Sequence, residues 1–324
     1  MMDFNTFRQV VKDNILDFMG EEYKNCTIEE SEYKKTNETI HYLSIKTGNS
    51  ISPAIPLEKV YDDYSMYPLD GINTCLAGLS DAIIRGMERS KAVESALNNS
   101  KGYFVPCLVN TKANEELLAE SPHREVADLS IIYREILFGE DGTSTFGSVR
   151  VSNARADSLH MTEEDLFEAS KMCFDSDLYK INIASMNSVI STMFDPDIDA
   201  AEVSQDDVMF VATNRYGSWG ANALLDEGAM ERAKDIIGGD FYIIPSSIHE
   251  LIFIKKDGAD SEELKNFKDM VLFVNETQVE EKDRLSNNIY EYDSKSKTFK
   301  IAGDAVEKGI KDLDYKDPER NVTI

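Results

Sequence analysis

The sequence predicts an α+β fold, with an N-terminal helix and a small hairpin region followed by a mixed, mostly antiparallel sheet with flanking helices. Segments with a helical spacing of apolar residues occur along the chain, and so do short apolar segments bounded by turn residues. The two kinds do not alternate regularly, which disfavours a doubly wound parallel sheet. Apolar residues make up 42% of the chain, enough to bury a core, so wholesale disorder is excluded.

The first hundred residues predict helices around a hairpin. Apolar residues recur every three or four positions from Phe4 to Phe18, and Asp3 and Gly20 suit the start and the stop of this helix. Prolines 53 and 56 make the segment 51–57 an edge strand or an extended link. The other elements expected here are a hairpin of 27–33 with 39–47, helices at 60–67 and 71–98, and a strand at 103–109.

The elements predicted in the second half of the chain are mostly shorter. Thr162 is a candidate helix N-cap, because three acidic residues follow it and favour a helix N-terminus. Gly238 and Gly239 are a fitting left-handed stop for a helix over 221–237. A further helix is expected at 261–278, with strands at 126–137, 146–151, 208–213, 241–244, 251–254, 288–292 and 298–301.

Turn residues near 98–102 and Ser121-Pro122 indicate a domain boundary between the two halves. We predict an N-terminal α+β region over 1–110 and a C-terminal α+β domain over 120–305. The polar residues 306–324 are expected to form a fraying tail.

The charge balance excludes two classes of binding partner. The chain has 34 Lys and Arg against 60 Asp and Glu, a net charge of −26, and each third of it is acidic. No basic cluster longer than a dipeptide is present, which argues against direct binding to nucleic acid or to an anionic membrane surface. No apolar run reaches the roughly 18–20 residues of a membrane span.

The cysteines indicate the cellular compartment of the protein, and the histidines bear on whether it binds a metal. The four cysteines lie tens of residues apart without a CxxC pair, which is typical of reduced, mostly buried thiols in a cytoplasmic protein. The N-terminus lacks the basic start and continuous apolar stretch of a signal peptide. The histidines outside 245–250 share no metal-ligand spacing, so we predict no cofactor and no metal.

The segment 195–206 resembles an EF-hand loop, with acidic residues at ligand positions 1, 3, 5 and 12. Ala200 stands where the loop needs glycine, and Asp206 is shorter than the usual bidentate Glu. A solvated acidic loop is therefore favoured over a calcium site. The candidate acidic surface consists of Asp195, Asp197, Asp199, Glu202, Asp206 and Asp207.

Two polar loops are candidate functional sites. The loop 213–221 joins a predicted strand to a predicted helix and contains Asn214, Tyr216 and Trp219, the only tryptophan. It matches neither a dinucleotide fingerprint nor a phosphate loop, so a tight turn that packs Trp219 against the sheet is favoured over an anion site.

The loop 245–250 contains a possible nucleophile, base and orienting acid. Ser246 or Ser247 could attack a substrate, with His249 as the base and Glu250 orienting it. Triads are usually assembled from distant segments, so a serine that caps a short helical turn is favoured over catalysis.

Three strings carry a family resemblance: VMFVATNRYGSWGANALL, GGDFYIIPSSIHELIFI and VNETQV. With the N-terminal helix and hairpin and the stretch ISPAIPLEKVYDDY, they make the chain resemble domain of unknown function 5688. The resemblance implies an uncharacterised family of anaerobic gut bacteria, often near mobile elements, with no assigned activity. The matching positions are Asn214, Tyr216, Gly217, Ala221, Pro245, Ser246, Ser247, His249, Glu250, Asn275 and Glu276.

The leading functional hypothesis is a non-enzymatic protein that binds a protein partner through its acidic surface. One version is a mobile-element-encoded inhibitor of a host defence system that mimics nucleic acid and occupies a basic, nucleic-acid-handling partner. The alternatives are a small-molecule-binding or hydrolytic enzyme built on the loops 213–221 and 245–250, and a structural or toxin-neutralising interaction protein. The sequence leaves the oligomeric state open.

Overall fold

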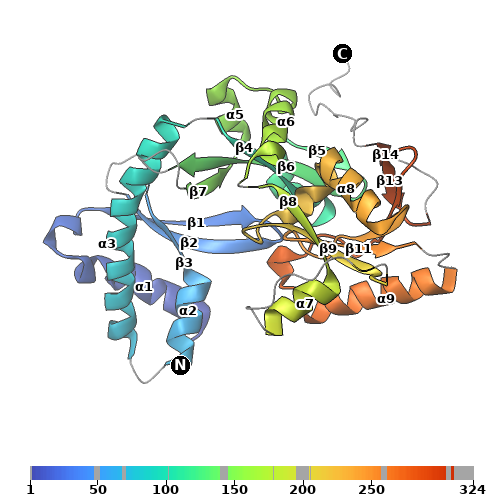
Figure 1. Ribbon diagram of the computed structural model, residues 1–324. Helices are drawn as coiled ribbons and strands as arrows, with labels where there is room; N and C mark the ends of the chain where they lie inside the picture. The colour runs from blue at the N-terminus through green and yellow to red at the C-terminus, as the bar shows by residue number, and fades with distance from the viewer. Residues whose placement is uncertain are drawn as a thin grey trace, which may run out of the picture. The chain divides into compact units, whose positions relative to one another are not determined.

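The computed structural model describes residues 2–46, 52–67, 71–100, 102–138, 145–177, 179–194, 204, 206–256, 261–303 and 308–309. Backbone contacts divide the chain into two units, which are coloured along the sequence in Figure 1. Unit 1 is Met1–Lys101 with Leu137–Gly147, and unit 2 is Gly102–Ile136 with Ser148–Ile324. Each unit is therefore discontinuous in sequence, and the predicted domain ranges stay a prediction. The predicted tail 306–324 lies outside the described residues except for 308–309.

Unit 1 combines three helices with a small antiparallel sheet, as predicted. Helix α1 begins after the N-cap Asp3, whose carboxylate accepts the backbone N–H of Thr6 at 3.0 Å. Strand β3, which follows Pro53 and ends at Pro56, is an edge strand that pairs with β2. The elements are α1 (Phe4–Met19), η1 (Glu21–Tyr23), β1 (Thr27–Lys35), β2 (Glu38–Lys46), β3 (Ala54–Pro56), α2 (Leu57–Met66) and α3 (Gly71–Asn98).

The core of unit 1 lies between the helices and the hairpin. The buried face of α1 presents Phe7, Val11 and Ile15, each 0% exposed, at the predicted helical spacing. They pack with Leu43 of β2 and Leu79 of α3 in one apolar cluster.

A four-stranded sheet lies mainly in unit 2, and in it β6 pairs with three other strands. Its strands are β4 (Phe104–Asn110), β5 (Arg124–Val126), β6 (Leu129–Phe138) and β7 (Thr145–Arg150). The helical elements along this stretch are η3 (Lys112–Asn114), α4 (Glu115–Ala119), α5 (Asn153–Leu159), α6 (Glu163–Lys171) and η4 (Met172–Asp175).

The strand predicted over 126–137 is present as β6 from Leu129 onward, but the prediction is wrong at its start, where a tight turn separates β6 from Val126, the last residue of β5. Ala127 takes a left-handed conformation at φ 53°, which the sequence does not signal because alanine rarely adopts it. The side chain of the next residue, Asp128, accepts hydrogen bonds from Ser286 at 2.6 Å, Asn288 at 3.0 Å and Tyr290 at 2.5 Å. These distant residues hold the turn in place.

Unit 2 also contains a seven-stranded sheet in the order β14-β13-β12-β10-β11-β9-β8, and its neighbouring strands pair antiparallel. The strands are β8 (Ile181–Ser185), β9 (Met209–Asn214), β10 (Phe241–Ile244), β11 (Leu251–Lys255), β12 (Tyr290–Asp293), β13 (Thr298–Ile301) and β14 (Lys308–Gly309). The helical elements are α7 (Met186–Phe194), η5 (Gly220–Leu225), α8 (Glu227–Ile237), α9 (Ser261–Thr277) and η6 (Glu281–Asp283).

The continuous helix predicted over 221–237 is also wrong. Asp226 is extended, at φ −93° and ψ 99°, and separates the short 3-10 helix η5 from α8. All of η5 is buried and is held by distant polar groups, for example the Ile248 carbonyl, which accepts the Ala221 N–H at 3.3 Å. Helix α8 ends at Gly238 with φ 90°, as the predicted left-handed stop requires.

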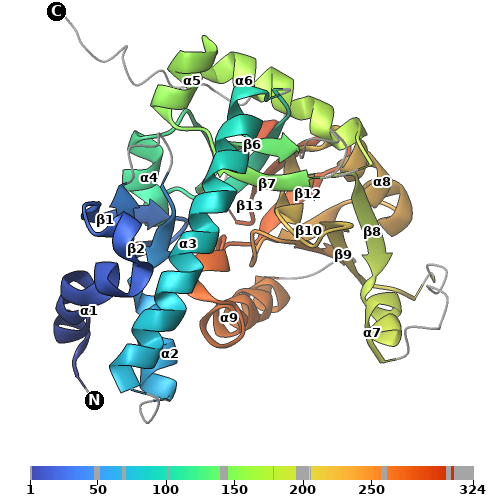
Figure 2. The same cartoon turned by 90° about the vertical axis from the view of Figure 1, so that its left-hand side faces the viewer.

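The two faces of the seven-stranded sheet bury different clusters. Tyr242, Ile244 and Ile254 pack with Val271 of α9, and the alternate residues Ile243 and Phe253 belong to a larger cluster with α8 and the four-stranded sheet. Figures 1 and 2 show α8 and α9 on opposite faces. The α+β class is confirmed, with the strands divided among three sheets rather than gathered in one.

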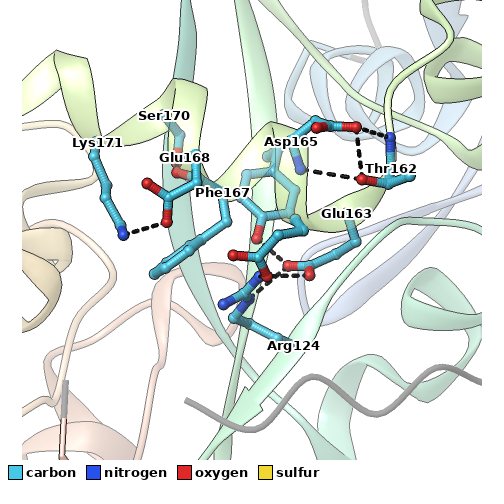
Figure 3. A network of polar contacts seen from close by, with 10 residues as sticks. Arg124, Thr162, Glu163, Asp165, Phe167, Glu168, Ser170 and Lys171 are labelled. Atoms are coloured by element: carbon cyan, nitrogen blue, oxygen red, sulfur yellow. Dashed lines mark hydrogen bonds and ion pairs between the residues drawn. The ribbon is translucent and has the colours of Figure 1, made fainter. Parts of the chain in front are cut away.

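Helices α5 and α6 are fastened to the four-stranded sheet by buried ion pairs. Arg124 of β5 binds Glu163 of α6 through two hydrogen bonds of 2.7 Å, and its guanidinium lies 3.7 Å from the ring centre of Phe167 (Figure 3). Glu163 also accepts a hydrogen bond from Tyr133. The Thr162 hydroxyl and the Asp165 carboxylate form the predicted N-terminal cap of α6 as a reciprocal capping box.

No helix among the described residues combines the length and the apolar character needed to cross a lipid bilayer.

Candidate functional site

The structure brings together the two candidate loops, which lie about thirty residues apart in the sequence. The Thr213 hydroxyl donates to the carbonyl of His249 at 2.8 Å, and the Trp219 N–H faces the imidazole Nδ1 of His249 at 3.4 Å. The Trp219 and His249 rings lie 6.4 Å apart. Both loops belong to unit 2, where they leave the ends of β9 and β10.

The side chain of Asn214 organises the first loop. Its carbonyl oxygen accepts the Tyr216 N–H at 3.0 Å, and its amide donates to the Ser218 carbonyl at 2.6 Å. Asparagine commonly closes a turn in this way, by bonding to the backbone two residues ahead. Asn214 is buried, so its role is to shape the loop rather than to meet a ligand.

Gly220 allows the loop to approach the second loop closely. A Cβ at this position would lie 2.2 Å from the His249 carbonyl oxygen and 2.5 Å from the Thr213 hydroxyl. The preceding Trp219 is left-handed at φ 59°, a conformation that costs a residue with a side chain about 1–2 kcal/mol. The loop is therefore held in a defined path that its own residues do not prefer.

The serines of the second loop are poorly placed for nucleophilic catalysis. Ser246 and Ser247 are 6% and 5% exposed, and the Ser247 hydroxyl accepts the backbone N–H of His249 at 3.0 Å. The predicted short helical turn is absent from the described residues 245–250, so Ser247 caps a bend. Its backbone pairs with Arg284 in an isolated bridge.

Both nitrogens of His249 are occupied by the protein. Nδ1 faces the Trp219 N–H, which places the ring proton of a neutral imidazole on Nε2. Nε2 lies 3.3 Å from Asp283 Oδ1, so the orienting carboxylate is Asp283 and not the predicted Glu250, which is half-buried. With neither nitrogen available to a substrate, His249 is a positioning residue for the Trp219 loop.

Beside this loop lies a half-buried arginine, Arg134 of β6. Its Nε donates to the Ser148 hydroxyl at 3.0 Å, its Nη2 donates to the Ser148 carbonyl at 3.1 Å, and its guanidinium lies 5.3 Å from the Trp219 ring centre. The third nitrogen, Nη1, has no hydrogen-bond partner among the described residues, and no described carboxylate pairs with Arg134.

A row of tyrosines continues the site. The ring of Tyr179 lies 6.5 Å from that of Tyr103 and 6.3 Å from that of Tyr216. Burial raises the pKa of Tyr179 to about 12, against the opposing positive charge of Arg134. Tyr216 is 47% exposed and lies 5.0 Å beneath the exposed guanidinium of Arg215. We call Arg134, Tyr179, Arg215, Tyr216 and Trp219 the arginine–aromatic cluster.

Sequence reasoning missed Arg134 and Tyr179. One signal for Arg134 was present, because Arg134 and Glu135 interrupt the otherwise apolar run from Ile131 to Phe138. A charged pair in such a strand needs partners. Glu135 pairs with Arg155 through two hydrogen bonds of 2.8 Å, whereas the hydrogen bonds of Arg134 to described residues go to the hydroxyl and carbonyl oxygens of Ser148.

Most of the candidate acidic surface lies outside the described residues: Asp195, Asp197, Asp199 and Glu202. Asp206 is exposed. Asp207 is buried and does not contribute to an exposed surface, because its carboxylate accepts the Ser204 N–H at 2.9 Å and the Asn187 amide at 2.7 Å. These hydrogen bonds, the one from Ser204 first, lower the pKa of Asp207.

No metal-binding group of three His, Cys, Asp or Glu side chains occurs among the residues that the structure describes. The four cysteines are free thiols, of which Cys107 and Cys173 are buried. Burial raises the pKa of Cys107 to about 12, so its thiolate is disfavoured at neutral pH.

Comparisons with known proteins give a family and no activity. No curated protein and no solved structure matches the chain. A family model, described as a family of unknown function (DUF5688), matches residues 4–294 and so includes both candidate loops and the arginine–aromatic cluster. The chain belongs to the family of unknown function DUF5688.

Proposed function

We propose that the protein binds an anionic small molecule at the arginine–aromatic cluster. The observation that carries this proposal is Arg134, a half-buried guanidinium that no described carboxylate neutralises. Acidic residues outnumber basic ones by 60 to 34 in this chain, so a carboxylate partner would be easy to supply. An anionic ligand is the natural partner for a cation that no described carboxylate neutralises.

Two other arginines of unit 2, the buried Arg124 and the partly buried Arg155, differ from Arg134. Arg124 pairs with Glu163 and Glu164, and Arg155 pairs with Glu135. Two of the three guanidinium nitrogens of Arg134 donate hydrogen bonds to Ser148. The third nitrogen, Nη1, can donate to a carboxylate or phosphate oxygen of a ligand. A group held in this way loses little side-chain entropy on binding.

Binding is favoured over hydrolysis because the hydrolytic constellation is not assembled. The two serines are buried, and both imidazole nitrogens of His249 face protein groups. A nucleophile needs a base within hydrogen-bond reach and an accessible oxygen.

Titration calorimetry with inorganic phosphate, pyrophosphate and citrate tests the proposal. We expect at least one of them to bind, and Arg134→Gln to weaken that binding at least tenfold, because a charge-assisted hydrogen bond contributes about 1.5–3 kcal/mol. Arg89→Gln is the matched control, since Arg89 is exposed on α3 in unit 1. Absence of binding, or equal weakening by both substitutions, would contradict the proposal.

A second candidate function is binding of a basic protein partner, and the net charge of −26 favours it. A pull-down from host lysate at low and at high salt addresses it. A basic, nucleic-acid-handling partner that is recovered only at low salt supports this candidate, and failure to recover one at either salt concentration contradicts it.

A further inference from the structure

Resting on the proposed function, we propose that the ligand is a nucleoside phosphate, whose planar base stacks on Tyr216 and whose phosphate binds Arg134 and Arg215. The proposal deepens the anion site by assigning the aromatic side chains beside it. Tyr216 and Trp219 lie on the same loop as Arg215, and the Arg134 guanidinium lies 5.3 Å from the centre of the Trp219 ring.

The first step of the argument is the exposed aromatic ring. Tyr216 is 47% exposed although it lies in a row with the half-buried Tyr179 and Tyr103. The Tyr179 ring lies 6.3 Å from the Tyr216 ring, and about half of the Tyr216 side chain stays accessible. An accessible tyrosine ring is a common platform for a nucleobase.

The second step is the placement of charge. The Arg215 guanidinium lies 5.0 Å from the centre of the Tyr216 ring, and the Arg134 guanidinium lies 5.3 Å from the centre of the Trp219 ring. Each cation therefore lies next to an aromatic ring of the loop. A ligand that joins a planar ring to an anion can contact both kinds of group, whereas a simple anion contacts the cations alone.

The third step is the rigidity of the loop. Asn214 fixes the backbone of Tyr216 and Ser218, His249 fixes the backbone of Trp219, and Gly220 packs against the second loop. The aromatic and cationic side chains are thus attached to a backbone that is already shaped before a ligand arrives. Such preorganisation lowers the entropic cost of binding.

The test compares ligands that carry one or both halves of a nucleotide. Trp219 is the only tryptophan, so its selectively excited fluorescence reports directly on the site in the full-length protein. The probes are AMP, ribose 5-phosphate, adenosine and benzoate. We expect AMP to bind at least tenfold more tightly than each of the other three.

Two variants separate the halves of the site. Tyr216→Leu is expected to abolish the advantage of AMP over ribose 5-phosphate while the affinity for ribose 5-phosphate stays within twofold. Tyr67→Leu, at a tyrosine that is 61% exposed in unit 1, is the matched control and should change neither affinity. Because Tyr216 is largely exposed, its substitution leaves the core of unit 2 intact.

The outcomes distinguish this inference from the anion site on which it rests. If AMP and ribose 5-phosphate bind equally, and Arg134→Gln weakens both, the anion site stands and the nucleotide assignment fails. If benzoate binds as tightly as AMP, the ligand class is an aromatic carboxylate and the assignment is overturned. If none of these probes and none of the simple anions binds, both proposals fail.

Discussion

At the scale of single residues, Trp219 and Gly220 determine how the candidate site is built. Trp219 adopts a left-handed backbone conformation, which is unfavourable for any residue with a side chain. Gly220 lies so close to the second loop that there is no room for a Cβ. The sequence identifies the loop through its glycines and its lone tryptophan. It could not identify Arg134 or Tyr179 as neighbours of that loop, because those contacts join residues 37 and 85 positions apart in the sequence.

Gly220→Ala is expected to destabilise the protein by about 1–3 kcal/mol, because the new methyl group meets backbone atoms that cannot move independently of the two loops. Chemical unfolding measures the change. The control is Gly78→Ala, at a helical position of α3 where a Cβ meets nothing within 4 Å and where alanine has the higher helix propensity. Equal stability of the two variants would refute the argument.

At the scale of elements, the sequence patterns predicted those helices, turns and caps that depend on interactions between residues close in the sequence. The N-terminal hairpin, the helix Phe4–Met19 and the N-cap at Thr162 were predicted from spacing and caps, and all are present. The two errors, at 126–137 and 221–237, each lie at a residue that separates two elements: the left-handed Ala127 and the extended Asp226.

Helix α6 depends on a buried charge that its sequence pattern does not reveal. We expect Glu163→Gln to lower the free energy of unfolding by about 3 kcal/mol, because it leaves the guanidinium of Arg124 without its principal buried counter-charge. Glu168→Gln on the same helix is the control, since its carboxylate is 57% exposed and its pairing with Lys171 contributes about 0.5 kcal/mol or less. A comparable loss in both variants would mean that the buried pair is not what fastens α6.

At the scale of the whole molecule, acidity is the feature that the sequence makes most visible. Some of the acidic side chains, however, have a structural role. Asp240 accepts two hydrogen bonds from Ser294, and these lower its pKa. Asp293 accepts backbone hydrogen bonds from Ser296 and Lys295, which also lower its pKa. The net charge therefore includes carboxylates that close turns as well as carboxylates that a partner could meet.

The stability of the protein should consequently fall in acid. For Asp240 and Asp293 the folded-state pKa lies below the ordinary value of 3.8, so their contribution is complete above that value and is lost as the pH falls through the folded pKa. Urea unfolding at a series of pH values below about 5, at high salt to suppress general charge repulsion, measures this loss. Asp240→Asn should flatten the acid limb, and an unchanged slope in that variant would exclude Asp240 as a source.

The Asp128 carboxylate has a consequence for how the chain acquires its structure during synthesis. Asp128 lies in the turn between β5 and β6, but the three side chains that donate hydrogen bonds to its carboxylate come from residues 286–290. A nascent chain that has emerged only as far as α9 would hold that carboxylate without its partners. We therefore expect the second unit to reach its native state only after residues 286–290 have been synthesised and released from the ribosome.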